Sequence, residues 1–242
     1  MGGLYIGTSG YTYAAWRGVF YPKGVAQRTW LSFYAQHFNA VEINATFYRP
    51  FPQSVFARWQ EMTPPDFHFV LKAPRIITHE KKLHDIENEL NSFLSSIEGL
   101  GEKLALILWQ FPAGQRADDL KERFSEFVST LPRSPRHVFE FRHASWFTED
   151  LYAHLEQQNA GFVINDSPHM KSQEVNTAGL MYIRFHGPGK LYDSSYSLEQ
   201  LESWAERIRP RLADHEVYLF FNNTFAGQAL ENARQLRDLL AE

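Results

Sequence analysis

Cysteine is absent from the 242 residues. Its absence excludes disulfide bonds, thiolate nucleophiles and every zinc or iron–sulfur site that needs thiolate ligands, and it is typical of cytoplasmic proteins. The sequence also lacks any run of about 20 apolar residues, the length that a membrane-spanning helix requires. Its first residues, MGGLYIGTSG, show no signal-peptide pattern. We therefore expect a cytoplasmic protein with no membrane span.

An excess of positive charge is missing as well. The chain has 24 Lys and Arg against 28 Asp and Glu, which gives a formal net charge of -4. Proteins that bind nucleic acid without sequence preference usually carry a basic patch, so the charge disfavours that class but leaves room for a local basic cleft. Hydrophobic residues make up 44% of the chain, enough to build a core and to exclude intrinsic disorder.

Short apolar runs recur along the whole sequence. Each is too short for an independent helix and is rich in β-branched or aromatic residues, which predicts a buried strand. The eight runs are Leu4–Ile6, Val41–Ile43, Phe67–Leu71, Leu104–Trp109, Val138–Phe141, Phe162–Ile164, Met181–Phe185 and Val217–Phe221.

Helical patterns lie in nearly every gap between these runs. Apolar residues recur at spacings of three and four, for example from Leu83 to Ile97, as in amphipathic helices. A Ser197-x-x-Gln200 capping box and a Thr148 N-cap mark two helix starts. Only the stretch 167–179, between the sixth and seventh strands, has no helical pattern.

Alternating strands and helices predict an α/β fold, a single-domain (β/α)₈ TIM barrel over residues 1–242 with an irregular connection between strands 6 and 7. The length agrees, since such barrels typically have about 250 residues. A doubly wound open sheet is the main alternative, but no Gly-rich dinucleotide fingerprint follows the first strand.

Polar residues stand at seven of the predicted strand ends, where a TIM barrel places its chemistry. Side chains alternate between the two faces of a strand, and several polar residues are in phase. The pairs on one face are Glu42 with Asn44, Glu140 with Arg142, and Arg184 with His186. Buried charges must pair, so a purely structural ion-pair network is one interpretation. Polar ends in phase on so many strands favour a ligand site.

General acid–base chemistry is what the residue types at these ends can perform. The predicted catalytic residues are Glu42, Lys72, Glu140, Asp166 and His186. A buried lysine can lose its proton near neutral pH, so Lys72 is also a candidate for Schiff-base formation.

Substrate binding is assigned to polar and aromatic residues at the same ends. Arginines and the loops after strands 7 and 8 suit an anion, and Tyr and Trp suit a ring. The candidates are Asn44, Gln110, Arg142, His143, Arg184, Gly187, Asn222, Asn223, Tyr11, Trp16, Tyr48, Trp146 and Tyr192. An ordinary Gly-Pro turn and a small second core that covers the barrel are the alternatives for the glycine loop and the aromatic residues.

No cofactor is predicted. The carboxylates Glu42, Glu140 and Asp166 with His143 and His186 are ligand types that a divalent metal accepts. Because no metal-binding spacing is present and nearby Lys and Arg would repel a cation, metal binding is the less favoured alternative.

Several segments together resemble one known family. They are Gly7-Thr8-Ser9-Gly10-Tyr11, Val41-Glu42-Ile43-Asn44-x-Thr46-Phe47-Tyr48, Phe67-x-Phe69-x-x-Lys72, Glu140-Phe141-Arg142-His143-x-Ser145-Trp146 and Arg184-x-His186-Gly187. They resemble, in order, the motifs of the YecE-like family, domain-of-unknown-function family 72, over nearly the whole chain. The resemblance implies a TIM barrel but no reaction. Tyr11 stands where that family more usually has Trp.

We therefore expect an enzyme that acts on an anionic, phosphorylated or carboxylated small molecule carrying a ring. A nucleic-acid-binding or repair-nuclease-like barrel and a non-catalytic metabolite-binding protein are the alternatives. The substrate, the reaction and the oligomeric state stay open.

Overall fold

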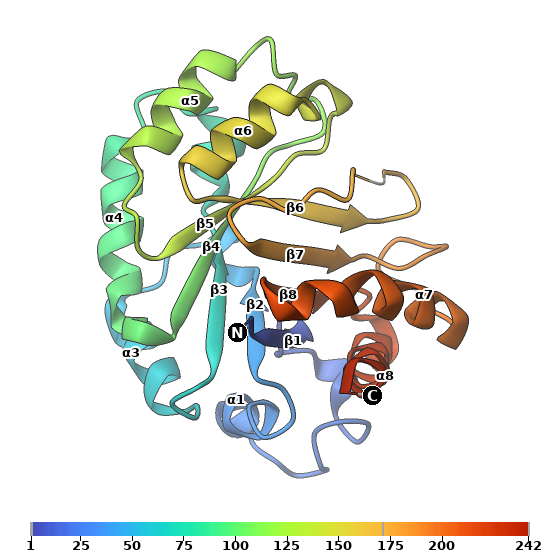
Figure 1. Cartoon of the computed structure of the whole chain (residues 1–242). Coiled ribbons are helices and arrows are strands. Elements are labelled where there is room, and N and C mark those ends of the chain that lie inside the picture. The colour runs from blue at the N-terminus through green and yellow to red at the C-terminus, as the bar shows by residue number, and fades with distance from the viewer. Residues whose placement is uncertain (1, 171, 242) are drawn as a thin grey trace.

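Eight parallel strands form the centre of the molecule (Figure 1). The computed structural model describes residues 2–170 and 172–241. The strands are paired in the order β1-β8-β7-β6-β5-β4-β3-β2. They are β1 Leu4–Thr8, β2 Ala40–Ile43, β3 His68–Lys72, β4 Leu104–Gln110, β5 Arg136–Glu140, β6 Gly161–Asp166, β7 Leu180–Phe185 and β8 Glu216–Phe221. The prediction of a (β/α)₈ TIM barrel is confirmed.

Helices surround the strands. They are α1 Trp30–Tyr34, α2 Ala45–Tyr48, α3 Gln53–Glu61, α4 Glu87–Ile97, α5 Lys121–Thr130, α6 Glu149–Gln157, α7 Leu198–Ile208 and α8 Gln228–Ala241. Between β6 and β7 the described residues contain no helix, as the sequence predicts. None of the helices in the described ranges is long and apolar enough to cross a membrane.

Side chains closing the gap between β1 and β2 complete the barrel. No ladder joins these two strands, and the residues just after β1 reach β2 through the bridge between Ser9 and Glu42 and the hydrogen bond from Gly10 N to the Glu42 carbonyl at 2.7 Å. Below it, Asn39 Oδ1 accepts a hydrogen bond from Ile6 N at 2.9 Å. The Tyr34 hydroxyl accepts from Thr8 N at 2.8 Å and donates to the Ala40 carbonyl at 3.2 Å. Backbone polar groups that lack a strand partner are thereby satisfied by side chains.

Two apolar layers pack against the sheet. Inside the barrel lie Val70, Leu108, Val138 and Val163, among others, while their strand neighbours pack outward against the helices. Because side chains alternate between the two faces of a strand, the residue two positions further along the chain from each interior residue also points inward. From Val138 that step leads to Glu140, and the other strands reach Glu42, Lys72, Gln110, Asn165 and Arg184. The apolar interior thus gives way to polar groups at the C-terminal ends of the strands, here called the barrel mouth.

Candidate functional site at the barrel mouth

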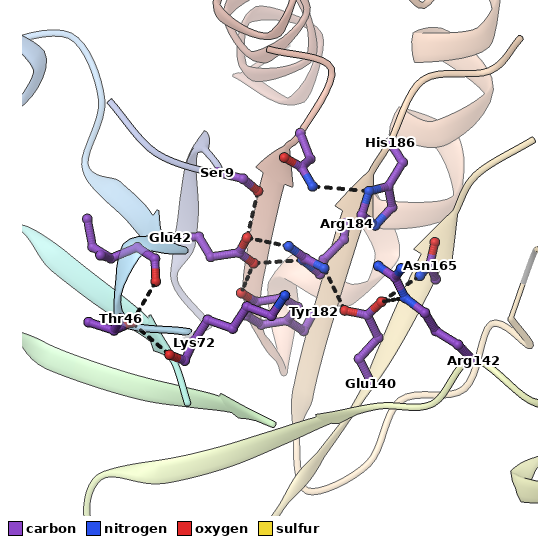
Figure 2. Close-up of polar contacts among 12 residues, drawn as sticks. Ser9, Glu42, Thr46, Lys72, Glu140, Arg142, Asn165, Tyr182, Arg184 and His186 are labelled. Atoms are coloured by element: carbon purple, nitrogen blue, oxygen red, sulfur yellow. Dashed lines mark hydrogen bonds and ion pairs between the residues drawn. The ribbon is translucent and has the colours of Figure 1, made fainter. Parts of the chain in front are cut away.

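Arg184 lies at the centre of the barrel mouth and joins its two sides (Figure 2). Its guanidinium donates from Nε and Nη2 to the two carboxylate oxygens of Glu42, at 2.9 and 2.7 Å. Its Nη1 donates to Glu140 Oε2 at 2.6 Å. All three side chains are 1% exposed or less. Charge-assisted, forked hydrogen bonds of this kind fix the geometry as well as supplying energy.

The two carboxylates are saturated by further donors. Glu42 also accepts from Ser9 Oγ at 2.6 Å and from the Tyr182 hydroxyl at 2.7 Å. Glu140 Oε1 accepts from Arg142 Nε at 2.7 Å and from Asn165 Nδ2 at 2.8 Å.

The environment of Glu140 keeps it ionised. Burial would raise the pKa of Glu140, but the adjacent Arg142 and Arg184 outweigh it and hold the pKa below its ordinary value. With its oxygens covered by donors and its pKa lowered, Glu140 is a poor general base. It serves instead to fix the two arginines.

Lys72 differs from the other charged groups of the mouth. Its side chain is buried, yet within the described residues Nζ has no hydrogen-bonding or ion-pair partner, and it lies 3.8 Å from the centroid of the Phe47 ring. Burial, followed by the positive charge of Arg184, lowers the pKa of Lys72 from 10.5 to about 7. In Figure 2 the amine points toward Arg184. Near neutral pH a large fraction of it is therefore an uncharged, nucleophilic amine.

A cavity of about 380 Å³ lies beside the network and is lined by Arg142, Asn165 and His186. Asn222 Nδ2 lies 3.1 Å from His186 Nδ1 and can only donate to it, so a neutral ring carries its proton on Nε2. Burial and then Arg184 lower the pKa of His186 well below its ordinary value, which keeps the ring neutral. His186 is thus a neutral donor in the cavity wall.

Three side chains in that wall have polar atoms without a protein partner among the described residues. His186 Nε2 and Asn165 Oδ1 are buried without a partner among the described residues. Among the described residues, Arg142 donates only from Nε, to Glu140, and its two Nη groups have no protein acceptor. Buried polar groups are normally hydrogen-bonded, so the unpartnered atoms of His186 and Asn165 point to a ligand. The Arg142 side chain is 25% exposed, so its Nη groups are accessible beside them.

Comparison of the sequence with known protein families identifies the family of this chain. Residues 5–242 match the family described as "Protein of unknown function DUF72". The chain belongs to the DUF72 family. The resemblance to YecE-like proteins seen in the sequence is thereby confirmed.

Relatives of this DUF72 chain match it over nearly its whole length. It is 25% identical to the UPF0759 protein YunF of Bacillus subtilis, over 98% of this chain and 94% of that protein. It is 27% identical to the UPF0759 protein YecE of Escherichia coli K12, over 94% of this chain and 89% of that protein.

Solved DUF72 structures share the barrel. A family member from Thermotoga maritima is 32% identical, aligns with a TM-score of 0.87, and covers 99% of this chain and 100% of that one. One from Enterococcus faecalis, at 22% identity and a TM-score of 0.81, supports the fold alone; the alignment covers 99% of this chain and 96% of that one. These relatives establish family and fold, and their names state no reaction.

Two predicted site residues of the DUF72 chain point away from the mouth. Because Asn165 points inward on β6, its neighbour Asp166 points outward, where it accepts a hydrogen bond from Trp204 Nε1 of α7 at 3.2 Å. After β8, Asn223 faces α8 and donates to Asn232 Oδ1 at 3.0 Å. The expectation that Asp166 and Asn223 line the mouth is corrected accordingly.

The aromatic candidates divide between core and surface. Trp16 and Trp146 are 0% and 2% exposed, and their indole nitrogens donate to the carbonyls of Thr224 and Gln115. Both indoles therefore have a packing role rather than the expected ligand contact. Tyr11 packs against the same core.

Tyr192 alone of the aromatic candidates lies beside the network. Its ring centroid is 5.6 Å from that of His186, and the residue is partly exposed. Tyr48 is highly exposed and packs edge-on against Phe47, on the side of the barrel where β2 ends. Tyr192 thus lies next to one wall residue of the cavity, His186, without lining the cavity itself.

The remaining candidates lie at the strand ends. His143 lines the cavity and shares a hydrogen bond with Ser145 Oγ at 2.9 Å. Gly187 has a φ of +98°, which favours glycine, and its N–H donates to the Tyr196 hydroxyl at 3.2 Å. Gln110 ends β4, and Asn44 follows β2 with a buried, unpartnered Oδ1 within the described ranges.

Sequence reasoning missed Ser9, Asn165 and Tyr182. Ser9, just after β1, and Tyr182 of β7 donate to Glu42, and Asn165 of β6 donates to Glu140. Strand phase was the available signal, because Tyr182 precedes the inward-pointing Arg184 by two residues.

Metal ligation was the other open question. Nowhere in residues 2–170 and 172–241 do three or more His, Asp or Glu side chains gather in a way that could hold a metal ion.

Proposed function

We propose that this DUF72 chain is an enzyme that binds a small anionic molecule at the barrel mouth and acts on it with the amine of Lys72. The observation that carries the proposal is the set of unused donors of Arg142 and His186 in the wall of the 380 Å³ cavity. Lys72, whose pKa is about 7, lies in the same mouth beside Arg184, outside the lining of that cavity. Unpaired polar groups and shifted pKa values that meet at a concave site are features of active sites.

An anion suits the unused groups better than a cation. Both carboxylates of the network are already covered by donors, whereas the Nη groups of Arg142 and Nε2–H of His186 can each donate to a carboxylate or phosphate. Asn165 Oδ1 would accept from a hydroxyl or amine of the same ligand. Tyr192, beside His186, supports a ligand that carries a ring.

Lys72 is the group best suited to chemistry. The neutral amine can take a proton from the bound molecule. It can also add to a carbonyl carbon, and loss of one water then gives a Schiff base between Nζ and that carbon. Either use depends on the low pKa that burial and Arg184 impose on the amine. Glu42 and Glu140 would keep Arg184 and Arg142 in place throughout.

Titration with phenyl phosphate and benzoate, followed by calorimetry and thermal melting, tests the anion site. We expect saturable binding and a melting temperature that rises with ligand concentration. The Arg142→Met variant should bind at least roughly 10-fold more weakly, because a charge-assisted hydrogen bond contributes about 1.5–3 kcal/mol. Arg116→Met is the matched control, since Arg116 is exposed and pairs only loosely with Asp118. Equal affinities in the two variants would reject the site.

Borohydride trapping with phenylpyruvate tests the amine. This probe combines a carboxylate, a ring and a ketone, so a Schiff base with it can be reduced to a stable secondary amine and located by mass spectrometry. We expect the adduct on Lys72, with a lower yield in Arg142→Met and none in Lys72→Met. An adduct that persists in Lys72→Met, or a mixture spread over surface lysines, would remove Lys72 from the proposal.

A further inference from the structure

A second cavity, larger than the one beside Arg142 and His186, lies past the ends of β2 and β3. Its volume is about 610 Å³, and it is enclosed by α2, the segment that leads into α3, the turn after β3, and α4. It has no lining residue in common with the cavity beside Arg142 and His186. Ligand pockets typically have volumes of about 300–1,000 Å³, so this cavity is large enough for an organic molecule of its own.

The walls of this cavity differ on its two sides. One side is aromatic and includes Tyr48, Phe51 and Phe93. Tyr48 is 70% exposed, although an aromatic ring of this size gains free energy when it is buried. The other side is a polar strip of α4 that includes Ser92 and Ser96. A flat ring could cover the aromatic wall while its edge meets the hydroxyl groups.

One acceptor in the lining is unpaired. Glu89 Oε1 pairs with Lys81 Nζ at 2.8 Å, while Glu89 Oε2 is buried without a partner among the described residues. The hydrogen bond from Lys81 lowers the pKa of Glu89, so the group is a carboxylate at neutral pH. Of the other charged residues in the lining, Arg75 and Glu80 pair with each other at 3.0 Å, and the Arg49 guanidinium lies over the Phe51 ring at 4.7 Å from its centroid. Glu89 Oε2 is therefore the group that a ligand donor would satisfy.

We propose that this cavity is a second ligand site, which binds a planar aromatic molecule whose amine or N–H group donates to Glu89. The site shares no lining residue with the cavity beside Arg142 and His186, although its lining includes Phe47, whose ring contacts Lys72. Its ligand needs a donor for Glu89 Oε2, whereas the mouth offers the donors of Arg142 and His186 to an anion.

Tryptamine is a suitable probe, since it combines an indole ring with an ammonium group. Calorimetric titration of the whole chain should give saturable binding. Ser92→Trp, which places a side chain in the cavity, should abolish it, whereas Ser95→Trp, on an exposed position of the same helix outside the cavity, should leave it unchanged. Glu89→Gln should weaken tryptamine at least roughly 10-fold, as expected for the loss of a charged hydrogen-bond partner.

Failure of the native chain to bind tryptamine, or equal losses in Ser92→Trp and Ser95→Trp, would overturn the proposal. Thermal melting of each variant shows whether the fold is retained, and a crystal soaked with tryptamine gives an answer that needs no variant. Electron density for indole against Tyr48 and Glu89 supports the site, and density only beside His186 contradicts it. Binding of phenyl phosphate at the mouth should be unchanged in Ser92→Trp, which separates this proposal from the first.

Discussion

Glu42 and Glu140 keep their charges in the interior of the barrel because donors reach them from several strands. Removing a carboxylate from water costs several kcal/mol unless hydrogen bonds replace the lost hydration. Arg184 supplies such bonds to both groups, and its position between them ties β2 to β5 across the barrel. Both carboxylates of the mouth are thereby paired with arginines. Lys72 lies beside the network without a carboxylate partner of its own, so no ion pair among the described residues offsets the effect of burial on its pKa.

The low pKa of Lys72 can be measured directly by titration of this one side chain. In the chain labelled with ¹⁵N-lysine, the Nζ resonance of Lys72 should titrate near pH 7, whereas an unperturbed lysine titrates near 10.5. Lys72→Met assigns the resonance. Phe47→Leu should lower the midpoint further, because the contact with the aromatic ring at 3.8 Å stabilises the ammonium form. A midpoint above about pH 9 would contradict the low pKa.

The free energy of unfolding should depend on pH because of Lys72. Lys72 releases its proton near pH 7 in the folded chain but near 10.5 in the unfolded chain, so the unfolded state binds more protons between these values. The contribution of Lys72 to the free energy of unfolding therefore rises as the pH increases from 7 to 10.5. Comparison of urea unfolding at pH 7 and pH 9 in the native chain and Lys72→Met isolates this slope, which the variant should lack.

At the scale of the element, the start of α7 offers the sharpest prediction. Ser197 Oγ accepts from Gln200 N at 3.2 Å, and Gln200 Oε1 accepts from Ser197 N at 2.9 Å, which is a complete capping box. Ser197→Ala should lower the free energy of unfolding by about 1 kcal/mol, or the melting temperature by roughly 2–4 °C. Ser203→Ala, at an exposed position inside the same helix, is the control and should change stability by less than about 0.5 kcal/mol.

Local signals explain why some helices could be predicted more closely than others. The caps Ser197 and Thr148 act within one turn, and the helices that they predict are present. The helix expected from Leu83 begins only at Glu87. Leu83 is buried as its spacing suggested, but its φ is +64°, so it lies in a loop rather than a helix. Spacing reports which residues are buried, and the backbone that buries them depends on the rest of the fold.

For the molecule as a whole, strand phase accounts for what the sequence could reveal of the site. Alternation from an apolar interior residue places Glu42, Glu140 and Arg184 inward without any knowledge of their partners. It fails where two polar residues are adjacent, because Asn165 and Asp166 are equally plausible inward groups until the β6 interior is known. Which groups meet across the barrel, such as Tyr182 with Glu42 at 2.7 Å, depends on how the barrel closes.

Closure itself can be tested at Gly7. A Cβ atom at this position would lie 2.0 Å from the Ala40 carbonyl and 2.7 Å from the Tyr34 hydroxyl, so any side chain forces β1 away from β2. The Tyr34 bridge and the Ser9–Glu42 pairing would be strained together. Gly7→Ala should therefore destabilise the chain by about 3 kcal/mol or more, or roughly 6–12 °C in melting temperature.

Gly114→Ala is the matched control, because a Cβ there meets nothing within 4 Å. It should leave the melting temperature within about 2 °C of the native value. The same strain must reach the mouth, since Ser9 and Glu42 join the two strands there. Lys72 in Gly7→Ala should then titrate away from pH 7 in any fraction that remains folded, and in Gly114→Ala it should not. An unchanged Lys72 midpoint in a folded but destabilised Gly7→Ala would mean that the network holds the mouth independently of the β1–β2 closure.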